Sequence, residues 1–315
     1  MVKFIRVSSG TAAILGLTEE RPWIKCETAY LLTARPCLAK CKFCSQSVKE
    51  KTKYLSRIEW PKFELELVGE KLRAKNFKRV CIQCTKYPEL FQDLIEVLEV
   101  LALEKPISIS APPFDKKEMK VLKELNTERI GIHLDCVNEK LFSELKPFYN
   151  WDEHFKAIKA ALKIFGDFRV TSHLIVGLGE KEEEVVAMID NLHSKKVLTS
   201  LFPFTPIKGT PLESWKKPPL WSYRKLQVAH YLIHEGLVDL SDITFNENGE
   251  IVDFGIALER LYLDLYDPYI FSTRGCPNCR RPYYTESPGG EMYNYPYGLS
   301  RDLIKREVTL LKKFL

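Results

Sequence analysis

Short apolar runs alternate with helical patterns along most of this chain, and this alternation constrains the fold more than any other feature. Six runs have the β-branched, turn-bounded character of strands: Glu27–Thr33, Arg79–Cys84, Pro106–Ser110, Arg129–Asp135, Arg169–Gly177 and Ser200–Phe204. Helical periodicity occupies segments between them: Lys62–Asn76, Leu90–Leu103, Lys116–Leu125, Trp151–Phe165 and Glu182–Leu192. Because strands alternating with helices form parallel βαβ units, the sequence predicts an α/β fold with a partial or full TIM-like (β/α) barrel. Functional residues should lie at the carboxyl ends of its strands.

The two ends of the chain depart from this pattern. Residues 1–25 show no regular periodicity and are predicted to form an irregular leader before a barrel at 26–265. Residues 266–315 form a C-terminal extension that contains Gly275–Cys279 and a run rich in Tyr, Pro and Gly. We expect this extension to pack against the barrel.

Composition narrows the class of protein. An apolar fraction of 45% over 315 residues suffices for a large core, yet no run approaches the roughly 20 apolar residues of a membrane helix. The weakly apolar stretch Thr11–Leu17 is short, and Glu19 and Glu20 follow it, so we expect no signal peptide and a cytoplasmic location. In that setting nine cysteines indicate metal or redox chemistry rather than disulfides. The net charge of +5 is mild, and we expect neither a nucleic-acid nor a membrane partner.

Three cysteines, Cys37, Cys41 and Cys44, lie in one short loop directly after the first predicted strand. Three thiolates this close can hold three irons of a 4Fe–4S cluster and leave the fourth iron open to a ligand. The alternatives are a zinc knuckle or three unrelated thiols. Zinc sites usually combine paired C-x2-C units or Cys with His, so the spacing favours the iron–sulfur cluster.

This spacing and its position resemble the radical S-adenosylmethionine (radical SAM) superfamily, in which the open iron chelates SAM. Four further segments resemble biotin synthase and its relatives, in the same order along the chain: Ser45–Ser47, Leu134–Asp135, Val176–Glu180 and Lys208–Leu212. The resemblance implies an enzyme that cleaves SAM to a 5′-deoxyadenosyl radical, which abstracts hydrogen from an unactivated C–H bond. It implies no catalytic side chain beyond the cofactors.

The resemblance also implies a set of SAM contacts: Phe43, Gln83, His133, Asp135, Ile175 and Gly177. Asp135, at a strand end, can accept a hydrogen bond from a ribose hydroxyl, or it can cap the following helix. His133 has the same side-chain parity as Asp135. The family has Asn there, in contact with substrate, so His133 is either a site residue or a buried structural histidine. Gly177 allows the backbone to approach a planar adenine.

A second metal site is predicted from a departure from biotin synthase, which takes sulfur from a second cluster held by cysteines on three strands. Cys81 matches the first of these ligands, but Ser108 or Ser110 and Thr171 stand at the other two positions. The biotin synthase ligand set is therefore absent.

The C-terminal extension contains two cysteines that biotin synthase lacks, Cys276 and Cys279. The C-x2-C spacing with Pro277 forms a tight turn in which both thiolates can bind one metal. Together with Cys81 and Cys26 they can close a second four-ligand 4Fe–4S cluster. Cys84 competes with Cys26 for the fourth place, although residues three apart in a strand face opposite sides. The alternative is a structural zinc ion held by the two cysteines of the extension.

The core together with the tail segments Arg281–Tyr284 and Tyr293–Pro296 resembles a component of the two-protein lipoyl synthases of archaea and some bacteria. This implies a sulfurtransferase that inserts sulfur into a protein-bound octanoyl chain. The implied partners are an octanoylated lipoyl domain or glycine-cleavage H protein, a sister radical SAM protein and a reduced ferredoxin-type electron donor. The alternative is another biotin synthase-like enzyme (a biotin synthase, mutase or maturase) with a structural zinc or no second cluster. A third reading, an RNA-binding module with a basic, tyrosine-rich tail, lacks a dense cationic surface.

Overall fold

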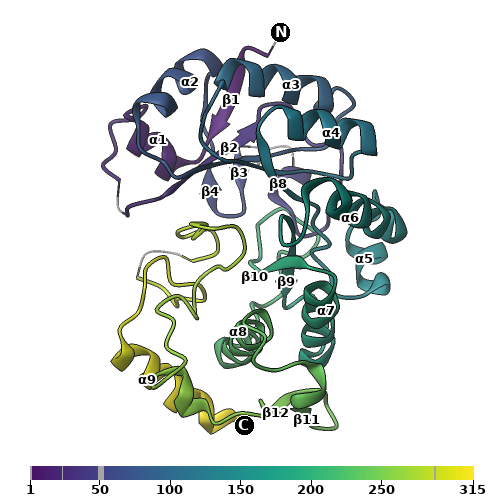
Figure 1. Cartoon of the computed structure of the whole chain (residues 1–315), viewed down its shortest axis with the longest axis vertical. Helices are drawn as coiled ribbons and strands as arrows, with labels where there is room; N and C mark the ends of the chain where they lie inside the picture. The colour runs from purple at the N-terminus through teal and green to yellow at the C-terminus, as the bar shows by residue number, and fades with distance from the viewer. Residues whose placement is uncertain (1, 23, 49–52, 287–288) are drawn as a thin grey trace.

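An eight-stranded sheet forms the centre of the molecule in a computed structural model that describes residues 2–22, 24–48, 53–286 and 289–315 (Figure 1). In spatial order its strands are β10 (Val197–Pro203), β9 (Val170–Val176), β8 (Thr127–Gly131), β7 (Ile107–Ser110), β6 (Arg79–Gln83), β2 (Thr28–Thr33), β1 (Phe4–Val7) and β5 (Lys62–Glu64). The six strands from β10 to β2 pair in parallel, whereas β1 pairs antiparallel with both β2 and β5. Within the described residues β10 and β5 remain the edges, so the barrel is partial. The predicted α/β fold and its six parallel strands are confirmed.

Helices follow the outside of this arc of strands (Figure 1). They are α1 (Ser9–Leu15), α2 (Leu65–Ala74), α3 (Leu90–Leu101), α4 (Lys116–Glu124), α5 (Glu139–Leu145), α6 (Trp151–Phe165), α7 (Glu182–Ser194) and α8 (Leu220–His234). The last helix, α9 (Arg301–Leu311), belongs to the C-terminal extension instead. Two small hairpins complete the regular structure, β3 (Tyr54–Leu55) with β4 (Ile58–Glu59) and β11 (Thr244–Phe245) with β12 (Ile251–Asp253). No helix in the described part of the chain is long and apolar enough to cross a membrane.

Two expectations about the first 76 residues are wrong. The leader is not irregular, because β1 and α1 lie within it and β1 joins the central sheet. The helix expected over Lys62–Asn76 is shorter, because Lys62–Glu64 is a strand that pairs with β1. Both strands are too short to show a period, and each is stabilised by a partner distant in sequence.

The two faces of the sheet differ in chemistry because side chains alternate along each strand. Val80, Ile82 and Ile109 are at most 1% exposed and pack into the apolar core that the helices cover. The residues between them, such as Cys81 and Ser108, point to the inner face. Polar and thiol groups therefore line the inside of the arc.

The C-terminal extension lies on the open side of the arc, as the yellow-green coil in Figure 1 shows. The Asn278 carbonyl oxygen accepts a hydrogen bond of 3.0 Å from Thr28 Oγ1 on β2. Tyr30 Oη accepts from the backbone N–H groups of Arg280 and Arg281 at 3.2 and 3.1 Å. These contacts bring Cys276 and Cys279 to the inner face of the sheet. The extension has no hydrophobic period of its own that would predict this position.

Candidate active site

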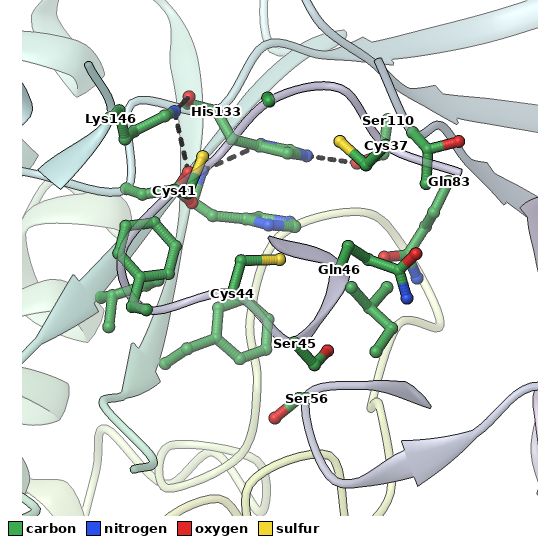
Figure 2. A pocket seen from close by; sticks show the side chains of 18 of the residues that line it. Cys37, Cys41, Cys44, Ser45, Gln46, Ser56, Gln83, Ser110, His133 and Lys146 are labelled. Atoms are coloured by element: carbon green, nitrogen blue, oxygen red, sulfur yellow. Dashed lines mark hydrogen bonds and ion pairs between the residues drawn. The ribbon is translucent and has the colours of Figure 1, made fainter. Parts of the chain in front are cut away.

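A cavity of about 260 Å³ opens at the carboxyl ends of the parallel strands. The loop after β2, the ends of β6 to β10 and the extension all contribute to its wall. Its polar and thiol-bearing lining includes Cys37, Cys41, Cys44, Gln46, Gln83, Ser110, His133 and Lys146, which Figure 2 labels. Asp135, His173 and Arg281 also line it. Because it gathers groups from segments far apart in sequence, it is the candidate active site.

Local hydrogen bonds hold the three-cysteine loop in place. The Lys86 backbone N–H donates to Cys37 Sγ at 3.3 Å, and the Leu38 N–H donates back to the Lys86 carbonyl at 2.7 Å. The Cys44 N–H donates to the Cys41 carbonyl at 3.1 Å, and the short 3-10 turn Ser45–Ser47 follows. As a result Cys37, Cys41 and Cys44 line the same cavity, as Figure 2 shows.

The thiol electrostatics suit a cationic partner. Burial raises the pKa of Cys44 to about 12, with the charge of Cys37 adding to the rise. Burial also raises the pKa of Cys41, and Cys44 and Cys37 add to that rise. Three thiolates this close together in a partly buried loop are therefore unfavourable unless cationic iron replaces their protons. Among the described residues no three Cys, His, Asp or Glu side chains converge on a single-ion site, but the cysteines of a cubane each bind a different iron. The donor set therefore fits a 4Fe–4S cluster.

Five of the six expected SAM contacts line this cavity: Phe43, Gln83, His133, Asp135 and Ile175. Gly177 is not among the lining residues. Its φ is 102°, and a Cβ added there would lie 2.8 Å from Cδ of Pro218. The Leu178 N–H donates to Glu180 Oε2 at 2.9 Å, and the Gly177 N–H donates to Oε1 of the same carboxylate. The glycine therefore shapes the turn after β9 rather than the cavity wall.

Asp135 is held by a lysine that sequence reasoning did not identify. Lys146 Nζ donates to Asp135 Oδ2 at 2.9 Å and to the His133 carbonyl at 2.7 Å. Figure 2 shows Lys146 beside His133. The Lys146 side chain is 4% exposed and that of Asp135 is 18% exposed. Asp135 also has a φ of 62°, and its peptide groups pair with His173 and Ile175 of β9. The carboxylate is therefore fixed at the cavity wall rather than serving as a helix cap.

Two histidines form the floor of the cavity. The rings of His133 and His173 are stacked, with centroids 3.4 Å apart and planes 6° from parallel. Burial lowers the pKa of both, and the nearby Arg281 charge adds to the effect. His133 Nδ1 accepts from the His173 N–H at 3.1 Å, so the proton is on Nε2, which donates to Ser110 Oγ. Neutral rings can stack in this way, whereas two imidazolium ions would repel each other.

A second, smaller cavity of about 20 Å³ lies beyond this floor. Ser110, His133, His173 and Arg281 line both cavities. Three of the predicted second-site cysteines, Cys81, Cys276 and Cys279, line the smaller one.

The two candidates for the fourth ligand lie differently. Cys84 lines the larger cavity instead, because β6 ends at Gln83 and Cys84 lies beyond the end of the strand. Cys26 lines neither cavity. Burial raises the pKa of Cys26 to about 11, and the neighbouring Cys279 adds to the rise, so Cys26 lies near the set. By donor chemistry these thiols fit iron or zinc. The free volume corresponds to about one water molecule, so a cubane requires the thiols to rotate outward.

Sequence reasoning missed Lys146, His173 and Arg281. His173 shares its strand parity with Thr171 and Ile175, and Arg281 follows Cys279 by two residues. The strand parity of His173 and the position of Arg281 next to a cysteine are visible in the sequence, but neither predicts that the side chain lines a cavity. Lys146 carries no local signal, because it reaches Asp135 only through the packing of α5.

Comparison with known proteins agrees with this geometry. The family model described as Radical SAM superfamily matches residues 31–192. A biotin synthase of Sulfurihydrogenibium sp. (strain YO3AOP1) is 28% identical over 182 residues, covering 56% of this chain and 54% of that protein. A lipoyl synthase of Geobacillus kaustophilus (strain HTA426) is 22% identical over 185 residues, covering 56% of this chain and 60% of that protein. The chain thus spans little more than half the length of the curated relatives it matches.

Solved structures show the same fold. A methylornithine synthase is similar with a TM-score of 0.51 and 18% identity, over 64% of this chain and 60% of that chain. The FeFe-hydrogenase maturase HydG from Carboxydothermus hydrogenoformans has a TM-score of 0.51 and 19% identity, over 67% of this chain and 52% of that one. From the family match and the three-cysteine cavity at the strand ends, we conclude that this chain belongs to the radical SAM superfamily, whose members use a 4Fe–4S cluster with SAM.

Proposed function

We propose that this protein inserts sulfur into unactivated C–H bonds of a protein-bound octanoyl chain, as a component of a lipoyl synthase. One observation carries the proposal: a second group of thiols, Cys81, Cys276 and Cys279, lies directly across the histidine floor from the three-cysteine cavity. Similarity to both a biotin synthase and a lipoyl synthase supports it.

In this proposal Cys37, Cys41 and Cys44 hold the SAM cluster, and Cys81, Cys276, Cys279 and Cys26 hold the second. When bound, the first cluster and SAM supply a hydrogen-abstracting radical, and the second cluster supplies sulfur. The protein's own contribution is to position SAM and the substrate carbon in the cavity. A substrate chain that fills the cavity would displace the water that could quench a radical.

Asp135 accepts a hydrogen bond from a ribose hydroxyl of SAM. The ion pair with Lys146 holds that carboxylate in place, and a carboxylate acceptor forms a stronger hydrogen bond than a neutral one. Phe43 and Ile175 provide apolar surface for the adenine, and Gln83 offers polar groups at the same wall.

The apolar part of the cavity suits an alkyl chain. Leu55, Phe202, Phe204 and Ile207 line it, and apolar walls stabilise an octanoyl chain through the hydrophobic effect. The chain would arrive on a lipoyl domain or H protein, a sister radical SAM protein would share the two insertions, and a ferredoxin-type protein would supply electrons.

The proposal is tested by anaerobic incubation of the iron-reconstituted protein with SAM, a reductant and an octanoyl-lysyl peptide, followed by mass spectrometry. We expect a sulfur adduct and 5′-deoxyadenosine. In Cys276→Ala, 5′-deoxyadenosine should still form while the adduct is lost. A Cys136→Ala variant is the matched control, because Cys136 lines neither cavity. An adduct of unchanged yield from Cys276→Ala would refute a required ligand role for this cysteine.

One observation favours a second candidate, a biotin synthase-like mutase or maturase with a structural zinc. The free volume of the smaller cavity, about 20 Å³, is closer to the size of a single ion than to that of a cubane, although no three ligand side chains converge on one ion among the described residues. Metal analysis separates the two candidates: the sulfur-insertion proposal expects about eight irons per chain, whereas the zinc candidate expects about four irons and one zinc.

A further inference from the structure

Three arginines surround the smaller cavity: Arg79 of β6, Arg129 of β8 and Arg281 of the extension. Arg79 is 4% exposed and Arg281 is 7% exposed, while the Arg129 side chain is 12% exposed. Arginine is rarely buried without a partner for its charge. Three such side chains around one small space therefore require a source of negative charge.

The hydrogen bonds of Arg79 and Arg129 leave the buried Nε–H donor of each side chain unused. Arg79 Nη1 donates to Ser108 Oγ at 3.0 Å, and its Nη2 pairs with Glu128. Arg129 Nη1 donates to the Phe168 carbonyl, and its Nε lies 3.6 Å from Glu128 Oε1, too far for a hydrogen bond. The buried Nε of each has no hydrogen-bond acceptor among the described residues.

Arg281 repeats this pattern from the extension. Its Nη1 donates to Gln83 Oε1 at 3.5 Å and its Nη2 to His173 Nε2 at 3.4 Å, both long contacts. Its Nε also lacks an acceptor within the described part of the chain. Leaving a buried donor unsatisfied lowers stability, so three of them around one space indicate a missing acceptor.

The smaller cavity also has more positive than negative charge around it. Glu128 is the carboxylate that pairs with Arg79 and Arg129, and no carboxylate forms an ion pair with Arg281 in the described residues. The other polar lining groups are neutral hydroxyls, two histidines and thiols. Among the thiols, Cys81 lies within electrostatic reach of Arg281 and Arg79, and Cys276 of Arg129 and Arg79. One carboxylate therefore stands against three positive charges, so the space favours an anion that carries hydrogen-bond acceptors.

We propose that Arg79, Arg129 and Arg281 form a cationic cage whose Nε–H groups donate hydrogen bonds to the sulfur atoms of the second cluster and raise its reduction potential. The inference rests on the proposed second cluster. Reduction adds an electron to an already anionic group, so positive charge and N–H···S hydrogen bonds stabilise the reduced form more than the oxidised form. The cage would thus set how readily this cluster accepts an electron when sulfur leaves it.

The test uses the full chain in which Cys37, Cys41 and Cys44 are all replaced by Ser, so that only the second cluster remains. After anaerobic reconstitution we expect about four irons per chain. Arg129→Met in this background should retain iron but lower the midpoint potential in an EPR-monitored redox titration. We expect the reduced-to-oxidised ratio at fixed potential to fall about tenfold, which is 59 mV for one electron.

The controls separate charge, hydrogen bonding and folding. Arg129→Lys keeps the charge but not the Nε geometry, and it should give an intermediate potential. Arg169→Met removes an exposed arginine from the same end of the sheet and should leave the potential unchanged. If Arg129→Met does not fold, Arg281→Gln supplies the same test from the extension. A four-iron protein whose potential is unmoved by the arginine variants would overturn the cage and leave the proposed function standing. Absence of iron from the triple-serine protein would remove the second cluster, and with it both proposals.

Discussion

Lys146 fixes the position of the segment after β8 in the active-site cavity, although it lies at the end of α5, eleven residues after Asp135. Its three ammonium hydrogens are matched by the Asp135 carboxylate and by the carbonyls of His133 and Leu134, the latter at 3.3 Å. Phe142 and Tyr149 present their rings to the same ammonium at 4.8 and 5.1 Å. A buried charge with this many partners is held in one rotamer, so the segment after β8 is held with it.

We predict that Lys146→Met lowers the free energy of unfolding by about 3 kcal/mol. This is the lower end for a broken buried ion pair, because Asp135 keeps 18% exposure. Adding Asp135→Asn should recover part of the loss, since the amide carries no charge. The exposed Lys156→Met on α6 should change stability by less than about 0.5 kcal/mol. Urea titrations measure all four proteins, and a Lys146→Met loss equal to that of Lys156→Met would contradict the ion-pair account.

The junction of β9 and α7 depends on a glycine conformation. Gly177 has a φ of 102°, which L side chains rarely adopt, and Pro218 occupies the space that a Cβ would need. Glu180 accepts from the two successive N–H groups of this turn. The turn thus brings β9 to its end at the cavity and starts α7 on the outer face.

Gly177→Ala should therefore be more damaging than Gly166→Ala at the end of α6. Gly166 has a φ of 94°, but a Cβ there would meet nothing within 4 Å. We expect backbone strain of about 1–3 kcal/mol in both variants and a further roughly 1–3 kcal/mol of steric overlap in Gly177→Ala alone. Denaturant unfolding of the two variants measures the difference in their free energies of unfolding. Equal losses of stability would show that Pro218 moves aside at no energetic cost.

Across the whole molecule, buried histidines link stability to pH. His230 and His234 of α8 both lie within hydrogen-bond reach of Thr199 Oγ1, at 2.9 and 2.8 Å. The His193 ring lies 5.1 Å from that of His234. Burial lowers the pKa of His234 to about 3, with His193 and Arg274 adding to the effect, and burial also lowers the pKa of His230.

The lowered pKa values of these histidines predict that acid destabilises the folded protein. Because the folded-state pKa of His234 lies below the unfolded value of about 6.5, the unfolded chain takes up protons first as the pH falls. The contribution to stability is fully present above about pH 6.5 and is lost progressively as the pH falls toward the folded pKa. One such histidine accounts for about 1–2 kcal/mol between pH 7.5 and pH 5.5. His234→Gln should reduce the pH dependence of the urea midpoint by that amount, and an unchanged slope would exclude His234 as a source.

Local patterns determined much of the architecture. The β-branched runs predicted all six parallel strands, and the three-cysteine loop after the first strand identified the cavity in which Cys37, Cys41 and Cys44 meet. These predictions succeed because period and spacing are properties of a single segment.

Contacts between distant segments were decided only by the tertiary structure. β1 and β5 are strands because each has the other as a partner. Lys146 reaches Asp135 across a helix, and the extension brings Cys276, Cys279 and Arg281 to the inner face of the sheet. Which buried donors remain unsatisfied also depends on neighbours far along the chain. The sequence by itself determined the strand–helix order and the chemistry available at each strand end; the packing of chain segments decided which of those groups share a cavity, because that depends on long-range contacts that no local period encodes.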